Sequence, residues 1–177
     1  MRFLTHKSIA AMVVITLVAL VSCQNTPMQP QSETAAGIQY VKANPEVLGL
    51  AKGELSVTEV VTKNNGAVLG GEDMHGNYVS IPGGALDENM TMTFSIDVTE
   101  DGVLTFSVEG AGVAEDEHIY FNDGQTATMA VNKDWLSDEP DIAVLIGADE
   151  QYTVSETAES YLVELPHFSR YAWGILE

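Results

Sequence analysis

The nine residues from 90 to 98 read MTMTFSIDV, and this stretch decides the fold. Apolar side chains at the even-numbered positions alternate without a break with polar side chains at the odd-numbered ones. Successive side chains of a β-strand point to opposite faces, so this period of two predicts a strand with one buried face and one exposed face.

The residues that follow predict a β-hairpin, and the apolar pattern selects its register. A two-residue turn at Asp101-Gly102 would set Val98 opposite Thr105, an apolar residue against a polar one. A three-residue loop with Gly102 in the left-handed conformation instead gives three apolar pairs: Val98 with Leu104, Ile96 with Phe106, and Phe94 with Val108. Because a slip of one residue turns the buried face outward, we predict the three-residue loop.

The rest of the chain predicts an all-β fold with one short helix near its start. Many short strands at regular spacing favour an antiparallel β-sandwich or an open barrel. The helix is expected at 45–52, where Asn44 can cap, Pro45 suits the first turn and Gly53 can close the last one. The further strands are expected at 57–62, 77–81, 118–121, 126–131, 142–147, 152–155, 160–165 and 168–175.

The first 22 residues have the layout of a secretory signal peptide. Arg2 and Lys7 precede the apolar run 9–20, which is short for a membrane span, and the run is followed by Leu20-Val21-Ser22-Cys23. That string resembles the lipobox of bacterial lipoproteins. The resemblance implies a diacylglyceryl thioether and an acylated amino group, typically palmitate, on Cys23, and Gln24 is similar to an outer-membrane address. We therefore expect residues 1–22 to be a signal peptide, 23–36 a flexible tether, and 37–177 one β domain anchored to the cell envelope.

The charge of the chain limits its partners. The sequence has 7 Lys and Arg against 26 Asp and Glu, a net charge of −19. Nucleic acid is excluded as a partner, since phosphate binding needs clustered basic residues. The densest acidic clusters are 115–117 and 134–141, neither of which has the ligand spacing of an EF-hand loop. They leave two hypotheses open: a solvated, salt-adapted surface and an acidic cation-binding domain.

Two motifs in the second half of the chain resemble one family. Residues 81–86 read IPGGAL, similar to the I-P-x-G-A-L signature of the ZU-five domain, which occurs in ankyrins, netrin receptors and many bacterial exported proteins. Residues 165–173, LPHFSRYAW, resemble the family's terminal H-F-S strand. The family usually has a second proline where this chain has Gly83. The resemblance implies a β-sandwich that holds partners together.

The same H-F-S triplet raises a chemical hypothesis. In some family members the chain cuts itself between Phe and Ser, so the resemblance implies cleavage of the Phe168–Ser169 bond. The Ser169 hydroxyl would attack the preceding carbonyl, His167 would take its proton, and water would hydrolyse the resulting ester. In a regular strand His167 and Ser169 share a face but lie about 6.6 Å apart, so a kink or a water would be needed. The same face carries Tyr171 and Trp173, which predicts a buried Ser169.

No other catalytic motif stands out. The histidines after the signal, His75, His118 and His167, have no metal-ligand spacing, so we expect no metal and no cofactor. The leading hypothesis is a non-catalytic binding or structural module on a lipid anchor at Cys23. It would meet the membrane through that lipid and an envelope protein or glycan through the domain.

Overall fold

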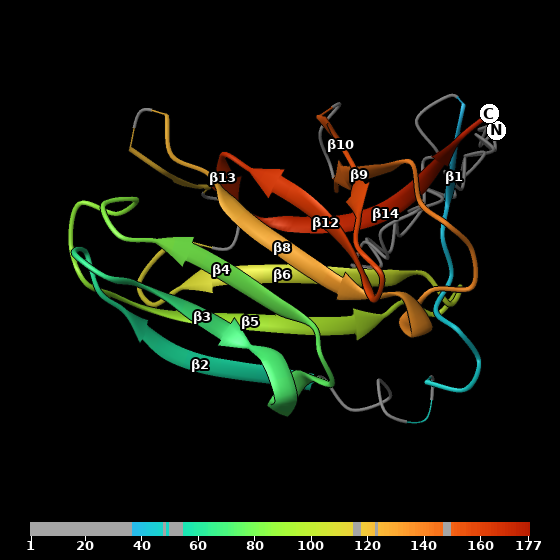
Figure 1. The fold of residues 1–177 in the computed structure, drawn as a ribbon, viewed down its shortest axis with the longest axis horizontal. Helices are drawn as coiled ribbons and strands as arrows, with labels where there is room; N and C mark the ends of the chain where they lie inside the picture. Colours follow the sequence, from blue (N-terminus) through green and yellow to red (C-terminus); the bar gives the residue numbers. More distant parts are fainter. Residues whose placement is uncertain (1–36, 48, 50–54, 115–117, 123, 147–149) are drawn as a thin grey trace, which may run out of the picture. The chain divides into compact units, whose positions relative to one another are not determined.

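The computed structural model describes residues 37–47, 49, 55–114, 118–122, 124–146 and 150–177. These residues form an all-β antiparallel fold whose sheets stay open rather than closing into a barrel. Figure 1 shows the long strands running in two layers along the longest axis. The prediction of an antiparallel all-β fold is confirmed.

The first sheet has seven strands and contains the stretch 90–98. Its order is β10 (Gln151–Thr153), β9 (Ile142–Leu145), β14 (Arg170–Leu176), β6 (Leu104–Gly110), β5 (Met90–Val98) and β2 (Leu55–Val61), with β1 (Ile38–Tyr40) paired to the far end of β14.

The second sheet has five strands, and a two-stranded ribbon accompanies the two sheets. The order of the second sheet is β11 (Ser155–Glu156), β12 (Ser160–Leu165), β8 (Ala127–Asn132), β4 (Tyr78–Pro82) and β3 (Gly66–Gly70). The ribbon pairs β13 (His167–Phe168) with β7 (Ile119–Tyr120). Two short 3₁₀ turns, η1 (Gly71–Met74) and η2 (Lys133–Trp135), complete the fold.

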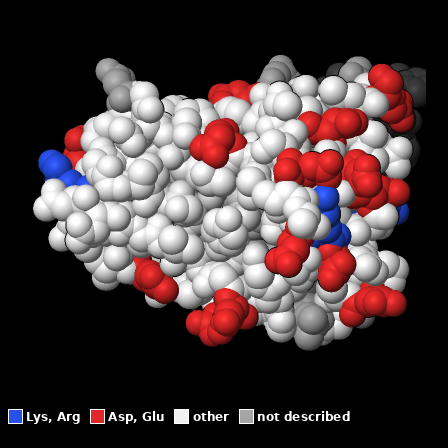
Figure 2. Space-filling view, in the orientation of Figure 1, with Lys and Arg blue, Asp and Glu red and all other residues white. Residues whose placement is uncertain are grey.

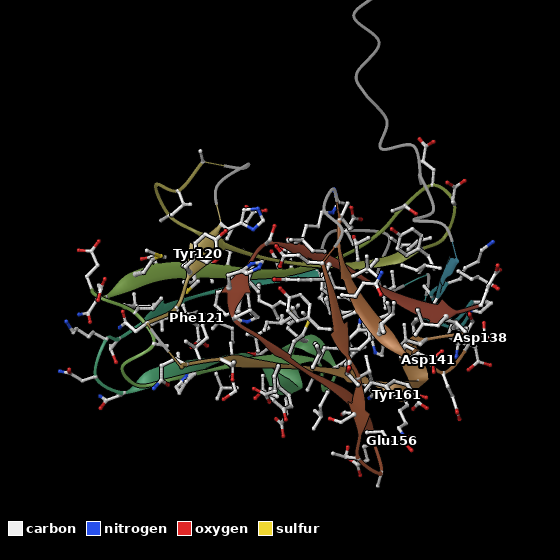
Figure 3. All side chains as sticks on the ribbon, turned by 90° about the horizontal axis from the view of Figure 1, so that it is seen from above. Tyr120, Phe121, Asp138, Asp141, Glu156 and Tyr161 are labelled. Carbon is white, nitrogen blue, oxygen red and sulfur yellow. The ribbon has the colours of Figure 1, made fainter. Side chains whose placement is uncertain are left out.

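The core lies between the two sheets, because each contributes the apolar half of its alternating strands. Phe94 and Phe106 are stacked neighbours on β5 and β6, and Trp173 meets Phe106 edge-on with ring centroids 6.0 Å apart. The second sheet faces them with fully buried side chains, among them Leu69, Val79, Met129 and Val163. Seen from above, the side chains of the two layers fill the space between the ribbons (Figure 3).

The β5–β6 hairpin has the predicted register. Val98 pairs with Leu104, Ile96 with Phe106 and Phe94 with Val108. Gly102 has φ +83°, in the left-handed region, and its amide donates to the carbonyl of Thr99. The buried face therefore selected the three-residue loop over the shorter turn.

Three strand predictions need correction. The stretch 152–155 is not one strand: it divides at Val154 into β10 of the first sheet and β11 of the second. The stretch 168–175 breaks at Ser169, where a bend separates β13 from β14. The third error is an omission, since neither β1 nor β3 was predicted. β1 lies in a stretch where no strand was expected. The other omission is β3. Its sequence GAVLG has glycine at both ends and no polar alternation.

The start of the chain lies mostly outside the described residues. This holds for the signal peptide, Cys23, the tether and much of the helix predicted at 45–52. Within that helix prediction, residues 45–47 form a turn, and the Asn44 side chain accepts a hydrogen bond from the Glu46 amide at 3.1 Å. Over the described part of the chain, no helix has the length and apolar character to cross a membrane.

The IPGGAL motif lies at the end of β4, beside the start of β3, at the open end of the β3–β4 hairpin. Pro82 ends β4, and Ala85 and Leu86 return to the core, as predicted. Two glycines allow the backbones to meet. A Cβ on Gly66 would lie 1.9 Å from the Ile81 carbonyl oxygen, and one on Gly83 would lie 2.2 Å from the Asn64 carbonyl oxygen. Any residue with a Cβ at position 83, proline included, would therefore clash with the backbone at Asn64.

This packing gives a matched pair of variants. Gly66 and Gly102 both have a positive φ, but a Cβ on Gly102 would meet only the end of the Lys42 side chain, at 4.0 Å. Gly102→Ala should cost about 1–2 kcal/mol for the left-handed conformation alone. Gly66→Ala must also move the β4 backbone, so we expect it to cost at least about 2 kcal/mol more. Thermal unfolding of the two full-length variants tests this, and equal melting temperatures would contradict the tight hairpin.

Candidate functional site

The ribbon β13–β7 holds two of the residues that the sequence singled out. His167 pairs with Tyr120 and Phe168 pairs with Ile119. Phe168 is buried and contacts the Phe121 ring edge-on, with centroids 4.6 Å apart. Phe168 therefore packs in the core, and His167 lies beside it at the rim of the sandwich.

His167 is the centre of a polar cluster that we call the histidine cluster: His118, Glu150, Tyr152, His167 and Tyr171. The His167 side chain is only 3% exposed, although its ring is polar. A buried polar ring is costly unless its nitrogens are hydrogen-bonded. The other four residues supply these partners, from the segment before β7, the segment before β10, β10 itself and β14.

The Nε2 atom of His167 faces two oxygens. It lies 3.0 Å from Glu150 Oε2 and 3.1 Å from the Tyr152 hydroxyl. Tyr152 donates its own proton to Glu150 Oε2 at 2.5 Å, so both oxygens act as acceptors toward His167. The Nε2 atom must therefore carry a proton.

The Nδ1 atom of His167 has different neighbours. It lies 3.2 Å from the Tyr171 hydroxyl and 3.4 Å from Nδ1 of His118. Tyr171 donates its proton to the His167 carbonyl oxygen at 2.8 Å. When Nε2 carries the only proton of the ring, Nδ1 of His167 presents a lone pair, and Nδ1 of His118 is placed to donate to it.

The surroundings shift the pKa values of the cluster in consistent directions. The hydrogen bond from Tyr152, and after it the one from His167, lowers the pKa of Glu150 below its usual range. Burial, followed by the hydrogen bond to Glu150, raises the pKa of Tyr152, and burial raises the pKa of Tyr171. Glu150 is therefore a carboxylate at neutral pH, while both tyrosines stay protonated donors.

Ser169 takes no part in this cluster. It lies in the bend between β13 and β14 and is half-buried, which corrects the expectation of a buried side chain. Among the contacts of the described residues, none joins the Ser169 hydroxyl to the His167 ring, whose two nitrogens face Glu150, Tyr152, Tyr171 and His118. His167 is therefore not placed to take the proton of the Ser169 hydroxyl, and cleavage of the Phe168–Ser169 bond is left to experiment.

Sequence reasoning found His167 but missed its partners. His118 and His167 are 49 positions apart, and Glu150 and Tyr152 come from yet another segment. No local spacing could join them, because they lie on segments that are far apart in the chain and meet only in the folded domain. The one available signal was the alternation around Tyr152 and Tyr171, which placed each on a strand without showing which strands meet.

Beside the cluster lies the most exposed large apolar side chain of the described chain. Tyr120 is 70% exposed, and its ring centroid is 5.2 Å from that of His167 and 6.0 Å from that of His118. Its neighbour Phe121 packs against Phe168 in the core. Figure 3 shows both residues far from the labelled acidic residues Asp138, Asp141 and Glu156.

The acidic residues form a surface rather than a metal centre. Figure 2 shows Asp and Glu side chains gathered over one half of the visible face. Lys133 bonds Glu156 there at 2.6 Å and lies 4.9 Å from the centre of the Tyr161 ring. Over the residues that the structure describes, no group of three or more His, Cys, Asp and Glu side chains could hold a metal ion. The cluster 115–117 lies outside the described residues.

Comparison with known proteins adds no relative. No protein-family model, curated protein or solved structure matches the chain. The resemblance to the ZU-five domain therefore rests on the IPGGAL and HFS motifs and stays a prediction.

The contacts of His167 predict the fate of the Phe168–Ser169 bond. Because both ring nitrogens are engaged elsewhere, we expect the bond to remain intact. Intact mass spectrometry of the denatured protein should show one species that includes residues 169–177. The Ser169→Ala variant should differ from it only by the mass of one oxygen atom. A released peptide that disappears in Ser169→Ala would instead establish self-cleavage.

Proposed function

We propose that this chain is a lipid-anchored β-sandwich of the bacterial cell envelope that binds another envelope component without catalytic turnover. The lipobox-like string that ends at Cys23 supports the anchor, and the all-β domain supports a rigid binding module. The observation that carries the proposal is Tyr120, which is 70% exposed beside the histidine cluster.

The chemistry around Tyr120 suits recognition. A tyrosine combines a large apolar ring with a polar hydroxyl and loses little side-chain entropy on binding, so tyrosines are enriched at interfaces. Here the strand pairing of β7 with β13 fixes the Tyr120 backbone, and the His118 and His167 rings lie beside the Tyr120 ring. The half-exposed Glu150 supplies a hydrogen-bond acceptor in the same neighbourhood. A protein or a glycan of the envelope fits such a surface.

The charge of the chain limits which partners the domain can bind. The chain has a net charge of −19, so we expect the domain to be repelled from anionic headgroups and to be unsuited to nucleic acid as a partner. The acyl chains on Cys23 would therefore hold the protein at the membrane while the domain reaches away from the lipid surface.

Photo-crosslinking in living cells tests the proposal. A photoreactive phenylalanine analogue at position 120 should give a discrete adduct with an envelope component. The matched control carries the same analogue at Val68, which is 55% exposed on β3, and should give none. A Cys23→Ala variant should leave the membrane fraction and lose the adduct.

Two results would contradict the proposal. The first is an absence of adducts at position 120, or the same adducts at positions 120 and 68, which would remove the binding surface. The second is membrane association that persists in Cys23→Ala, which would remove the anchor.

A further inference from the structure

The rings of His118 and His167 face each other through the same atom, Nδ1. Nδ1 of His118 and Nδ1 of His167 lie 3.4 Å apart, close enough to share one proton in a hydrogen bond. Two nitrogen ligands of a tetrahedral Zn²⁺, each about 2.0–2.1 Å from the ion, stand about 3.4 Å from one another. The pair is therefore spaced as two ligands of one ion would be, and the ion would take the place of the shared proton.

Glu150 and Tyr171 hold the His167 ring in the form that a metal ion needs. Metal-bound histidines generally donate their second ring N–H to a carboxylate or a carbonyl, which fixes the tautomer. His167 does this with Glu150 at 3.0 Å, so its Nδ1 lone pair points toward His118. Tyr171 donates its hydroxyl proton to the His167 backbone carbonyl at 2.8 Å, and the Tyr171 oxygen lies 3.2 Å from Nδ1 of the ring.

The site is also reachable and attracts cations. His118 is half-buried rather than enclosed, so it gives an ion a path from the solvent. The net charge of −19 raises the local concentration of cations around the domain. Imidazole nitrogens suit Zn²⁺, Cu²⁺ and Ni²⁺, whereas Ca²⁺ and Mg²⁺ prefer oxygen ligands.

We propose that His118 and His167 bind a divalent transition-metal ion, Zn²⁺ by preference, through their two Nδ1 atoms. Water completes the coordination, and Glu150 acts as a positioning residue for His167. This inference goes beyond the binding function proposed above and requires neither the lipid anchor nor a partner. Its failure and the failure of that function are therefore separate results.

Calorimetric titration with ZnCl₂ tests the site in the untagged, full-length protein in detergent. We expect saturable binding of one ion per chain. His118→Asn removes the outer ligand at a half-buried position and should weaken binding at least about tenfold. The matched control is His75→Asn, which changes the histidine whose ring lies 5.8 Å from that of Trp135 and should leave the affinity unchanged.

Glu150 gives a second, independent test. Glu150→Gln removes the carboxylate from His167 Nε2 and should weaken Zn²⁺ binding about tenfold, and Glu150→Asp should restore part of the loss. In nuclear magnetic resonance spectra, Cu²⁺ should broaden the ring signals of His118 and His167 before those of His75.

Three outcomes would overturn the proposal. They are no saturable Zn²⁺ binding up to about 1 mM, equal affinities in His118→Asn and His75→Asn, and broadening by Cu²⁺ that favours His75. Because His118 is only half-buried, its variant should fold, and the test stays decisive even if His167 variants do not.

Discussion

The structure depends on how the chain passes from one sheet to the other between β12 and β14. β12 lies inside the second sheet and β14 in the middle of the first, so residues 165–170 must connect two layers that face each other. Pro166 and Ser169 mark the two bends, and the short β13 between them pairs with β7. This crossing carries His167 into the rim of the core, where its side chain is only 3% exposed. The histidine cluster follows from that constraint, since a buried imidazole needs partners for both nitrogens.

The partners come from the other places where the chain changes layer. The segment around Val154 also passes between the sheets, and it brings Glu150 and Tyr152 to one side of the His167 ring. The ribbon brings His118 to the other side, and β14 returns with Tyr171. A sandwich in which the chain rarely passes from one sheet to the other could have a core made only of apolar side chains. Here the crossings meet at one rim, and a polar cluster forms beside the most exposed aromatic side chain, Tyr120. The proposed binding surface and the proposed metal site both use this rim.

The sequence predicted the parts of the fold that depend on one strand and its neighbour. The alternation at 90–98 and the left-handed Gly102 gave the correct hairpin register, because the buried face admits only one pairing. Prediction failed where a strand changes sheets, as at Val154 and Ser169, since alternation continues through a bend and does not show which layer a residue joins. β3 was missed because its glycines, typical of loops, are there for close backbone packing against β4. His167 was found by its motif. His118 and Glu150 were not found, because only the topology of the sheets brings them close to His167.

The central claim is that the crossing segment, residues 165–170, buries the His167 ring and that the Nε2 atom of this ring carries a proton. Nuclear magnetic resonance of the imidazole groups in the metal-free protein measures this most directly. The account predicts a ring N–H signal of His167 that exchanges slowly with water, that belongs to Nε2, and that shows proximity to Tyr152. A His167 ring whose N–H exchanges as fast as that of a surface histidine, or whose neutral form carries its proton on Nδ1, would contradict it.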